Sequence, residues 1–339
     1  MPSLVSICIP TYNGADHLDA CLQSALAQSV TDLEIIVVDD ASTDASPEVA
    51  RRHALTDERV KVHRNEARLG LAGNWNRCVE LAQGQWIKFL FQDDVLEPDA
   101  CKQLLAAGGP DRPLVTGKRR LVIEAGVNED TSNYFGRLPK LEGLFPSRDF
   151  VAPELLCTAL VQHLAVNFIG EPSAVLLHRS VFERFGGFNP LMIQLADLEF
   201  WARIGVHTGL AVVAKTVATF RIHPRSASST NLRAQKYRKD ILDPLILYHQ
   251  YGHGPGFGPL RRAASAMSPP VLFAKVTAVE AERARRMAEQ AARKGEPSML
   301  MAWREVARAH PRLRWSPRAW WLRLRRALGA RRSDDRRSP

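Results

Sequence analysis

The chain has 339 residues, which suits one large α/β domain with an appendage, or two domains. Its 45% hydrophobic and 24% charged residues are ordinary for a soluble globular protein with a sizeable core. The net charge of +10 is uneven, because ten arginines and two aspartates lie after residue 311 and supply +8 of it. The body is therefore nearly neutral, which argues against a nucleic-acid-binding protein.

Membrane-spanning and disulfide-stabilised architectures are not expected either. No segment approaches the about 18 uncharged apolar residues of a spanning helix. The first residues run directly into a strand-like segment without a basic region or cleavage site, so we expect a cytoplasmic protein. The five cysteines are far apart and form no Cys-x-x-Cys pair, which predicts reduced, partly buried thiols and no zinc site.

Strand and helix patterns alternate over the N-terminal third of the chain. The predicted strands are 3–9, 33–38, 60–63 and 85–91, and the predicted helices are 17–27, 72–82 and one that starts at Ser46-Pro47. This alternation predicts an α/β fold with a doubly wound, mainly parallel sheet flanked by helices.

The remaining segments are expected to extend this domain and then turn helical. We expect strands and loops over 110–146, a strand at 171–178, a helix at 197–205, two strands over 210–222 and helices beyond residue 230, clearest at 278–293. The expected parts are an α/β domain at 1–230, a helical extension at 231–311 and a basic, Trp- and Arg-rich tail at 312–339.

Polar side chains follow the predicted strands where they end. They are Thr11, Tyr12, Asp39, Asp40, Asp93 and Asp94. Because ligands of open α/β sheets bind beyond the carboxyl ends of the strands, these side chains predict a ligand site. Carboxylates suit Mg²⁺ or Mn²⁺, which can hold a diphosphate. The alternative for one Asp-Asp pair is a helix N-cap in a solvated turn, and the presence of two pairs favours the ligand site.

Five segments stand out in order along the chain. They are VSICIPTYNG (5–14), IIVVDDASTD (35–44), GQWIKFLFQDDVLEPD (84–99), IGEPSAVLLHRSVFERFGGFN (169–189) and ADLEFWARIG (196–205). Together they resemble the family 2 glycosyltransferases, which have the GT-A fold, and the resemblance covers about residues 3–230. It implies a GT-A-like domain that moves a sugar with inversion from a UDP- or dTDP-type donor, usually with a divalent metal.

The resemblance assigns the nucleotide-binding residues. Pro10, Thr11 and Tyr12 are expected to form the floor under the nucleobase. Asp40, with Asp39 beside it, is expected to accept hydrogen bonds from the base. The alternative for Tyr12 is a half-buried aromatic residue of a turn.

The family's metal motif is often Asp-x-Asp-Asp, and here Phe91 stands at its first acidic position. Gln92 is therefore expected to make the ribose contact as a neutral donor and acceptor. By resemblance, Asp93 is the expected ligand of Mn²⁺ or Mg²⁺, and Asp94 is its supporting carboxylate. His223 is expected to approach the diphosphate and the metal, and the alternative is a structural histidine.

Inverting transfer needs a general base that deprotonates the acceptor hydroxyl. The family often has Glu-Asp-x-x-x-Trp at the start of a helix, and this chain has ADLEFW at 196–201. Asp197 falls at the base position, and Ala196 departs from the pattern. The alternative for Asp197 is a carboxylate that answers the helix dipole. Glu199 is the second candidate base, and Glu171 is expected near the acceptor.

The basic tail predicts a helix in an anionic membrane interface. Ser316-Pro317 is typical of a helix start, and an apolar face follows at Trp320, Trp321, Leu324, Ala327 and Leu328. The alternatives are a terminal helix that packs on the protein and a disordered basic tail.

These patterns predict a glycosyltransferase that acts on a saccharide or lipid-linked saccharide, in cell-surface polysaccharide synthesis at the cytoplasmic membrane face. One alternative is a sugar nucleotidyltransferase, which would need a Gly-rich, basic loop after the first strand, and PTYNGADH (10–17) offers none. The other is a non-catalytic nucleotide-sugar-binding relative, which the presence of both Asp93 and Asp197 argues against.

Overall fold

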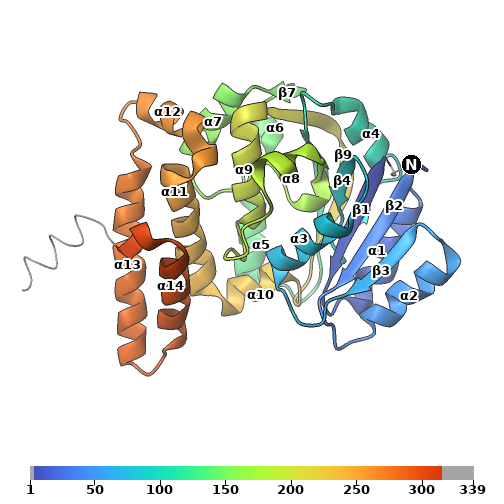
Figure 1. The fold of residues 1–339 in the computed structure, drawn as a ribbon, viewed down its shortest axis with the longest axis horizontal. Coiled ribbons are helices and arrows are strands. Elements are labelled where there is room, and N and C mark those ends of the chain that lie inside the picture. The colour runs from blue at the N-terminus through green and yellow to red at the C-terminus, as the bar shows by residue number, and fades with distance from the viewer. Residues whose placement is uncertain (1–3, 315–339) are drawn as a thin grey trace, which may run out of the picture.

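One nine-stranded sheet forms the centre of the computed structural model, which describes residues 4–314 (Figure 1). The strand order is β3-β2-β1-β4-β8-β6-β9-β5, and β7 pairs with β9. The first four strands are parallel, whereas β8 runs antiparallel to both β4 and β6. The strands are β1 (Val5–Thr11), β2 (Leu33–Asp39), β3 (Val60–Arg64), β4 (Trp86–Phe89), β5 (Val95–Leu96), β6 (Leu114–Ile123), β7 (Phe150–Val151), β8 (Val175–His178) and β9 (Leu210–Ile222).

Helices cover both faces of the sheet, which confirms the predicted α/β fold with a mainly parallel, helix-flanked sheet. The helices are α1 (Ala15–Leu26), α2 (Ser46–Thr56), α3 (Leu71–Leu81), α4 (Ala100–Ala107), α5 (Glu129–Gly136), α6 (Leu141–Leu144), α7 (Pro153–Gln162), α8 (Ser180–Phe185), α9 (Ala196–Thr208), α10 (Ala227–Ala234), α11 (Asp243–His253), α12 (Gly258–Ala266), α13 (Phe273–Arg293) and α14 (Ser298–Ala309). Single turns are η1 (Pro172–Ala174), η2 (Arg238–Leu242), η3 (Pro255–Phe257) and η4 (Pro311–Arg314).

The nearly continuous apolar runs of the first strands follow from burial on both faces. In β1, Ile7 and Ile9 belong to the core under α1, α2 and α4, whereas Cys8 belongs to the core under α3, α7 and α9. Successive side chains of a strand point to opposite faces, so a strand covered on both sides is apolar at most positions. The exceptions Ser6 and Glu34 are buried and bonded to each other, with Ser6 Oγ donating to Glu34 Oε1 at 2.6 Å.

Two predictions for the second half of the chain are wrong in detail. Residues 210–222 form the single strand β9 instead of two strands, because β6, β5 and β7 together supply partners along its length. The 110–146 segment holds the short helices α5 and α6 besides β6, where only strands and loops were expected.

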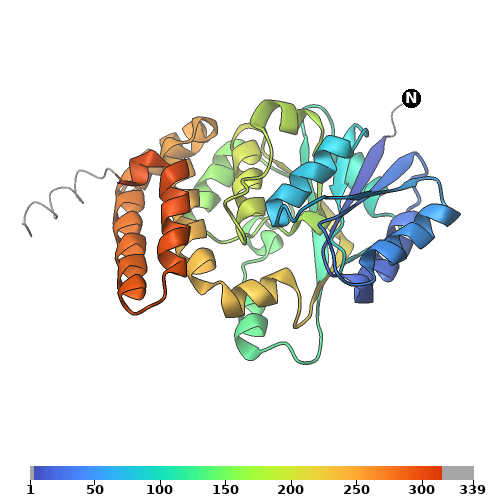
Figure 2. The ribbon, with the colours of Figure 1, turned by 60° about the horizontal axis from the view of Figure 1, so that its bottom comes forward.

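The C-terminal helices stand on the side of the molecule away from β3, next to α7 and α9, and α13 and α14 form a hairpin there (Figures 1 and 2). Trp201 of α9, Leu245 of α11 and Trp303 of α14 belong to one apolar cluster. The region beyond residue 230 therefore shares a core with the sheet region. The expected boundary at residue 230 falls inside α10, and the division into 1–230 and 231–311 stays a prediction.

Within residues 4–314, no helix has the length and apolar character needed to cross a bilayer. The five cysteines are all buried and unpaired by disulfides. Most of the 312–339 tail lies outside the described residues, and its first residues, 312–314, belong to η4.

Candidate active site

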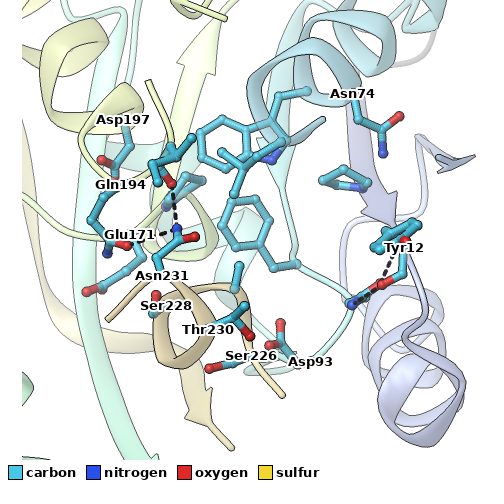
Figure 3. A pocket seen from close by; sticks show the side chains of 18 of the residues that line it. Tyr12, Asn74, Asp93, Glu171, Gln194, Asp197, Ser226, Ser228, Thr230 and Asn231 are labelled. Atoms are coloured by element: carbon cyan, nitrogen blue, oxygen red, sulfur yellow. Dashed lines mark hydrogen bonds between the residues drawn. The ribbon is translucent and has the colours of Figure 1, made fainter. Parts of the chain in front are cut away.

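A cavity of about 670 Å³ lies at the carboxyl ends of β1, β2 and β4 (Figure 3). Its size is typical of a small-molecule site. The predicted site residues that line it are Pro10, Thr11, Tyr12, Asp40, Gln92, Asp93, Glu171 and Asp197. Asp39, Asp94, Glu199 and His223 are not part of its lining.

Tyr12 is held by a clamp of two hydrogen bonds. Its backbone N–H donates to Gln92 Oε1 at 2.8 Å, and Gln92 Nε2 donates to the Tyr12 carbonyl at 3.1 Å. The Arg68 guanidinium lies over the Tyr12 ring, 3.9 Å from its centroid. Gln92 thus positions Tyr12, and Arg68 covers the ring face where a nucleobase would stack.

Asp40 organises the loop that carries Arg68. Its Oδ1 accepts from Asn65 Nδ2 and Leu69 N–H, and its Oδ2 accepts from Gly70 N–H at 2.9 Å. A carboxylate offers about four acceptor positions, so one stays open for a base. Asp39 accepts from Ser42 N–H and stands 3.5 Å from Arg64, behind the cavity wall.

Asp93 faces the cavity and Asp94 faces the protein interior. Asp94 is fully buried and accepts hydrogen bonds from the Ser173 hydroxyl and the Arg221 N–H. Burial, and next the charge of Asp93, raises the pKa of Asp94 well above its usual value. Asp94 therefore joins the β4 end to η1 and β9, and its supporting role at a metal stays a prediction.

A metal would find two side-chain ligands at this point. His223 Nε2 lies 3.2 Å from Asp93 Oδ2, and the His223 ring packs on His17. Among residues 4–314, no group of three or more His, Cys, Asp or Glu side chains could hold a metal ion. A carboxylate oxygen and an imidazole suit Mn²⁺ or Mg²⁺ only if a bound diphosphate supplies further oxygen ligands. The pair therefore fits a metal that arrives with the nucleotide.

Asp197 lies in the first turn of α9 and is buried in the cavity wall. Its Oδ1 accepts from Leu198 N–H at 2.7 Å, and its Oδ2 accepts from Asn167 Nδ2 at 2.8 Å. Burial is the main reason that the pKa of Asp197 is raised to about 7, and the nearby charge of Glu171 adds to it. A carboxylate with a pKa near neutrality is suited to exchange protons with a substrate.

Glu171 and Glu199 differ in their access to the cavity. Glu171 lines it and pairs with Arg119. Glu199 is buried on the other side of α9, where its carboxylate binds Arg203 at 2.6 Å. The structure thus brings Glu171, and not Glu199, next to Asp197.

Sequence reasoning missed Arg68, Asn167 and Tyr134. Asn167 interrupts an apolar stretch of the sequence, and a buried amide needs a partner, so its position was a usable signal. Burial raises the pKa of Tyr134 to about 12, and the charges of Asp197 and Glu171 add to this. Tyr134 on α5 therefore lies within electrostatic reach of the predicted base, which no local pattern reveals.

Comparison with known proteins identifies the family of the chain. Residues 6–159 match the model of glycosyl transferase family 2. EpsH of Bacillus subtilis, provisionally named a glycosyltransferase, is 40% identical over 253 residues, which are 72% of this chain and 67% of EpsH. An uncharacterised protein of Mycobacterium tuberculosis is 32% identical over 243 residues, 71% of this chain and 73% of that protein.

Among solved structures, Staphylococcus aureus TarS 1–349 in complex with UDP-GlcNAc has the same fold. Its TM-score is 0.53 at 16% identity, and 92% of each chain is covered. The family match and EpsH carry the assignment, and the structural likeness supports the GT-A architecture. The chain belongs to glycosyltransferase family 2 and is a glycosyltransferase with a GT-A-type fold.

Proposed function

We propose that this chain transfers a sugar with inversion from a UDP- or dTDP-sugar to a saccharide or lipid-linked saccharide. The observation that carries the proposal is the position of Asp197, a buried carboxylate with a pKa of about 7 on the wall of the cavity. In Figure 3, Asp197 and Glu171 lie at one end, Tyr12 and Asn74 at the other, and Asp93 between them. Sugar transfer needs the nucleobase site, the diphosphate site and the acceptor site with its general base to follow one another in this order.

The proposed reaction is one displacement at the anomeric carbon. Asp197 takes the proton of the acceptor hydroxyl, whose oxygen forms a bond to the anomeric carbon. The bond from that carbon to the diphosphate oxygen breaks on the opposite face, and the electron pair leaves with the nucleoside diphosphate. Asn167 donates a hydrogen bond to Asp197 Oδ2, and the Leu198 N–H donates one to Asp197 Oδ1. The two bonds fix the orientation of the carboxylate.

Asp93 and His223 are the proposed protein ligands of Mn²⁺ or Mg²⁺, which would neutralise charge on the leaving diphosphate. Arg221 lies beside them, since its Nε donates to the Asp93 carbonyl at 3.1 Å. Tyr12 and the open acceptor position of Asp40 are the proposed contacts of the nucleobase, which has to displace Arg68 from the Tyr12 ring.

The proposed setting is cell-surface polysaccharide synthesis at the cytoplasmic face of the membrane, with the tail as a peripheral anchor. The same cavity would also suit a sugar nucleotidyltransferase or a non-catalytic binder. The products distinguish the three activities, because a glycosyltransferase releases nucleoside diphosphate, a sugar nucleotidyltransferase releases pyrophosphate and a non-catalytic binder releases neither.

The test begins with thermal stabilisation by a panel of UDP-, dTDP- and GDP-sugars, with and without Mn²⁺. The donor so selected is then incubated with acceptors, and free nucleoside diphosphate and the anomeric configuration of the product are measured by coupled assay and NMR. Pyrophosphate release, a retained anomeric configuration, or no product with any donor contradicts the proposal.

A further inference from the structure

The wall beyond Asp197 has no assigned role in the chemistry above. It is built by α5 and by the segment that leads into and forms α10. The lining side chains there are Tyr134, Ser226, Ser228, Thr230, Asn231 and Arg238. In Figure 3, Ser228 and Asn231 lie on the same side of the cavity as Glu171 and Asp197, far from Tyr12.

The polar groups of this wall are mostly uncharged. Ser228, Thr230 and Asn231 offer hydroxyls and an amide, which can both donate and accept hydrogen bonds. Asn231 is fixed by bonds from its Nδ2 to the Ile193 carbonyl at 2.9 Å and to Gln194 Oε1 at 3.2 Å. The two bonds also fix the direction of the Asn231 Oδ1. The wall therefore presents a neutral acceptor in a fixed orientation.

The two arginines that line this wall are each paired with a carboxylate, and so are Arg119 and Lys239 next to it, the latter with Asp240. Arg119 pairs with Glu171, Arg225 with Asp16 and Arg238 with Glu305. Asp197 adds a further carboxylate to the same end of the cavity. Exposed ion pairs contribute little to stability, so one partner can be removed without unfolding the protein. Its removal changes the net charge of the wall. As it stands, the wall offers no surplus positive charge to an anion.

We propose that the wall of α5 and α10 selects a neutral sugar acceptor and discriminates against uronic acids and other anionic sugars. The inference rests on the proposed function, because it deepens the acceptor side of the same site. The hydroxyl and amide groups meet the sugar hydroxyls. Lys239 Nζ lies over one face of the Tyr134 ring, 5.7 Å from its centroid, and the sugar ring packs against the other face. Asp197 and Glu171 repel a carboxylate brought beside them.

The first experiment compares matched acceptors on the full-length protein with the donor selected above. The probes are p-nitrophenyl β-glucoside against p-nitrophenyl β-glucuronide, and p-nitrophenyl β-galactoside against the β-galacturonide. We expect kcat/KM for the neutral member of at least one pair to exceed that of its uronide by about tenfold or more, which is about 1.4 kcal/mol. Equal use of both members, preference for the uronide, or stimulation by none of the four overturns the inference.

The second experiment changes the charge balance. Glu305→Gln removes the partner of Arg238. The ratio of kcat/KM for the neutral acceptor to that for its uronide should fall about fivefold or more, mainly because KM for the uronide falls. Glu296→Gln is the matched control, since it makes the same change on an exposed residue of the α13–α14 hairpin. An unchanged preference in Glu305→Gln, or an equal change in Glu296→Gln, overturns the role assigned to Arg238.

The third experiment tests the apolar face. Tyr134→Ala should raise KM for the neutral acceptor about tenfold, while the donor-induced thermal shift stays as in the wild type, because the donor contacts at Tyr12 and Asp40 lie at the other end of the cavity. Asn133→Ala, which changes the exposed neighbour on α5, should behave as wild type. If Tyr134→Ala leaves acceptor KM unchanged while donor turnover persists, the inference fails and the proposed function stands. Loss of all donor turnover in the wild type would instead remove the proposed function itself.

Discussion

Asp197 has to be ionised before it can take a proton, yet burial raises its pKa to about 7. The fraction of ionised Asp197 therefore falls as the pH drops below about 7. We expect kcat/KM for transfer to fall with it, by about tenfold per pH unit well below that value. A pH–rate profile that stays flat down to about pH 5 would show that another group acts as the base.

Asp197→Asn should bind the donor and lose transfer by about a hundred- to ten-thousand-fold, because an amide cannot take the proton. Because the pKa of Asp197 is higher in the folded than in the unfolded state, its ionisation lowers the free energy of unfolding. This loss is complete above about pH 7 and shrinks as the pH falls towards the pKa of the unfolded state. The variant should therefore be at least as stable as wild type at pH 8, which thermal unfolding measures. A large loss of stability would make lost activity uninformative about the base.

Asp93→Ala should abolish the Mn²⁺-dependent part of the thermal stabilisation by UDP, because it removes one of the two proposed side-chain ligands. The protein without nucleotide should stay folded, since the Asp93 side chain faces the cavity and its loss removes one contact, that to His223. Asp111→Ala, at an exposed aspartate, is the control. Undiminished UDP binding in Mn²⁺ would argue against Asp93 as a ligand.

The sequence could place Asp93 and Asp197 because each directly follows a pattern that reports its element, an apolar strand or a helix start. It could not show how Asp40 is used. Two of the three partners of Asp40 are backbone amides of a loop some thirty residues later, and such bonds leave no residue type to recognise. The clamp between Gln92 and Tyr12 escaped for the same reason, since half of it is backbone.

At the scale of elements, one buried carboxylate connects the C-terminal helices to the site. Asp243 at the start of α11 is fully buried, and its Oδ2 accepts from the N–H groups of Ile193, Gln194 and Leu195 at 2.6 to 3.0 Å. These residues directly precede the α9 helix that carries Asp197. Asp243 therefore fixes the segment that places the proposed base.

Asp243→Asn should lower transfer by about tenfold or more and reduce the melting temperature, because charge-assisted hydrogen bonds are worth about 1.5–3 kcal/mol each. Donor binding, measured by thermal shift relative to the unliganded variant, should change little, since Tyr12 and Asp40 lie at the other end. Asp240→Asn makes the same change on an exposed residue of η2 and should behave as wild type. Equal losses in both variants would remove the positioning role of Asp243.

Elements were predictable where the sheet buries them on both faces. The strands β1 and β2 read as nearly continuous apolar runs, and the parallel order of the first four strands follows from the helices between them. The α5 and α6 helices were missed because they are short and carry only a few buried residues each, such as Phe135 and Leu141. A single buried position per turn gives too weak a period to distinguish a short helix from a loop.

At the scale of the whole molecule, the helices beyond residue 230 are part of one core with the sheet region. Trp303 of α14 and Trp201 of α9 join the same cluster although about a hundred residues separate them. Such packing depends on tertiary neighbours and leaves no local pattern, so the sequence could predict helices there but not where they dock.

The basic tail is the remaining feature at this scale, and the structure describes it only up to Arg314. Leu313 is buried and Arg312 contacts His253, so the chain is anchored on the protein to that point. Truncation after Arg314 therefore removes the Trp- and Arg-rich segment without opening the core. The matched pair for a membrane test is the full-length chain and this truncation.

The truncated protein should lose binding to liposomes that contain phosphatidylglycerol and keep the thermal stabilisation by its donor. The full-length chain should bind them at low salt, because each basic residue near an anionic surface contributes about 1 kcal/mol. Binding should weaken at high salt, which screens that attraction, and persist in part because Trp320 and Trp321 would still insert. Co-sedimentation at low and high salt measures both effects. If the full-length protein stays in the supernatant at low salt, the tail does not anchor it to the membrane.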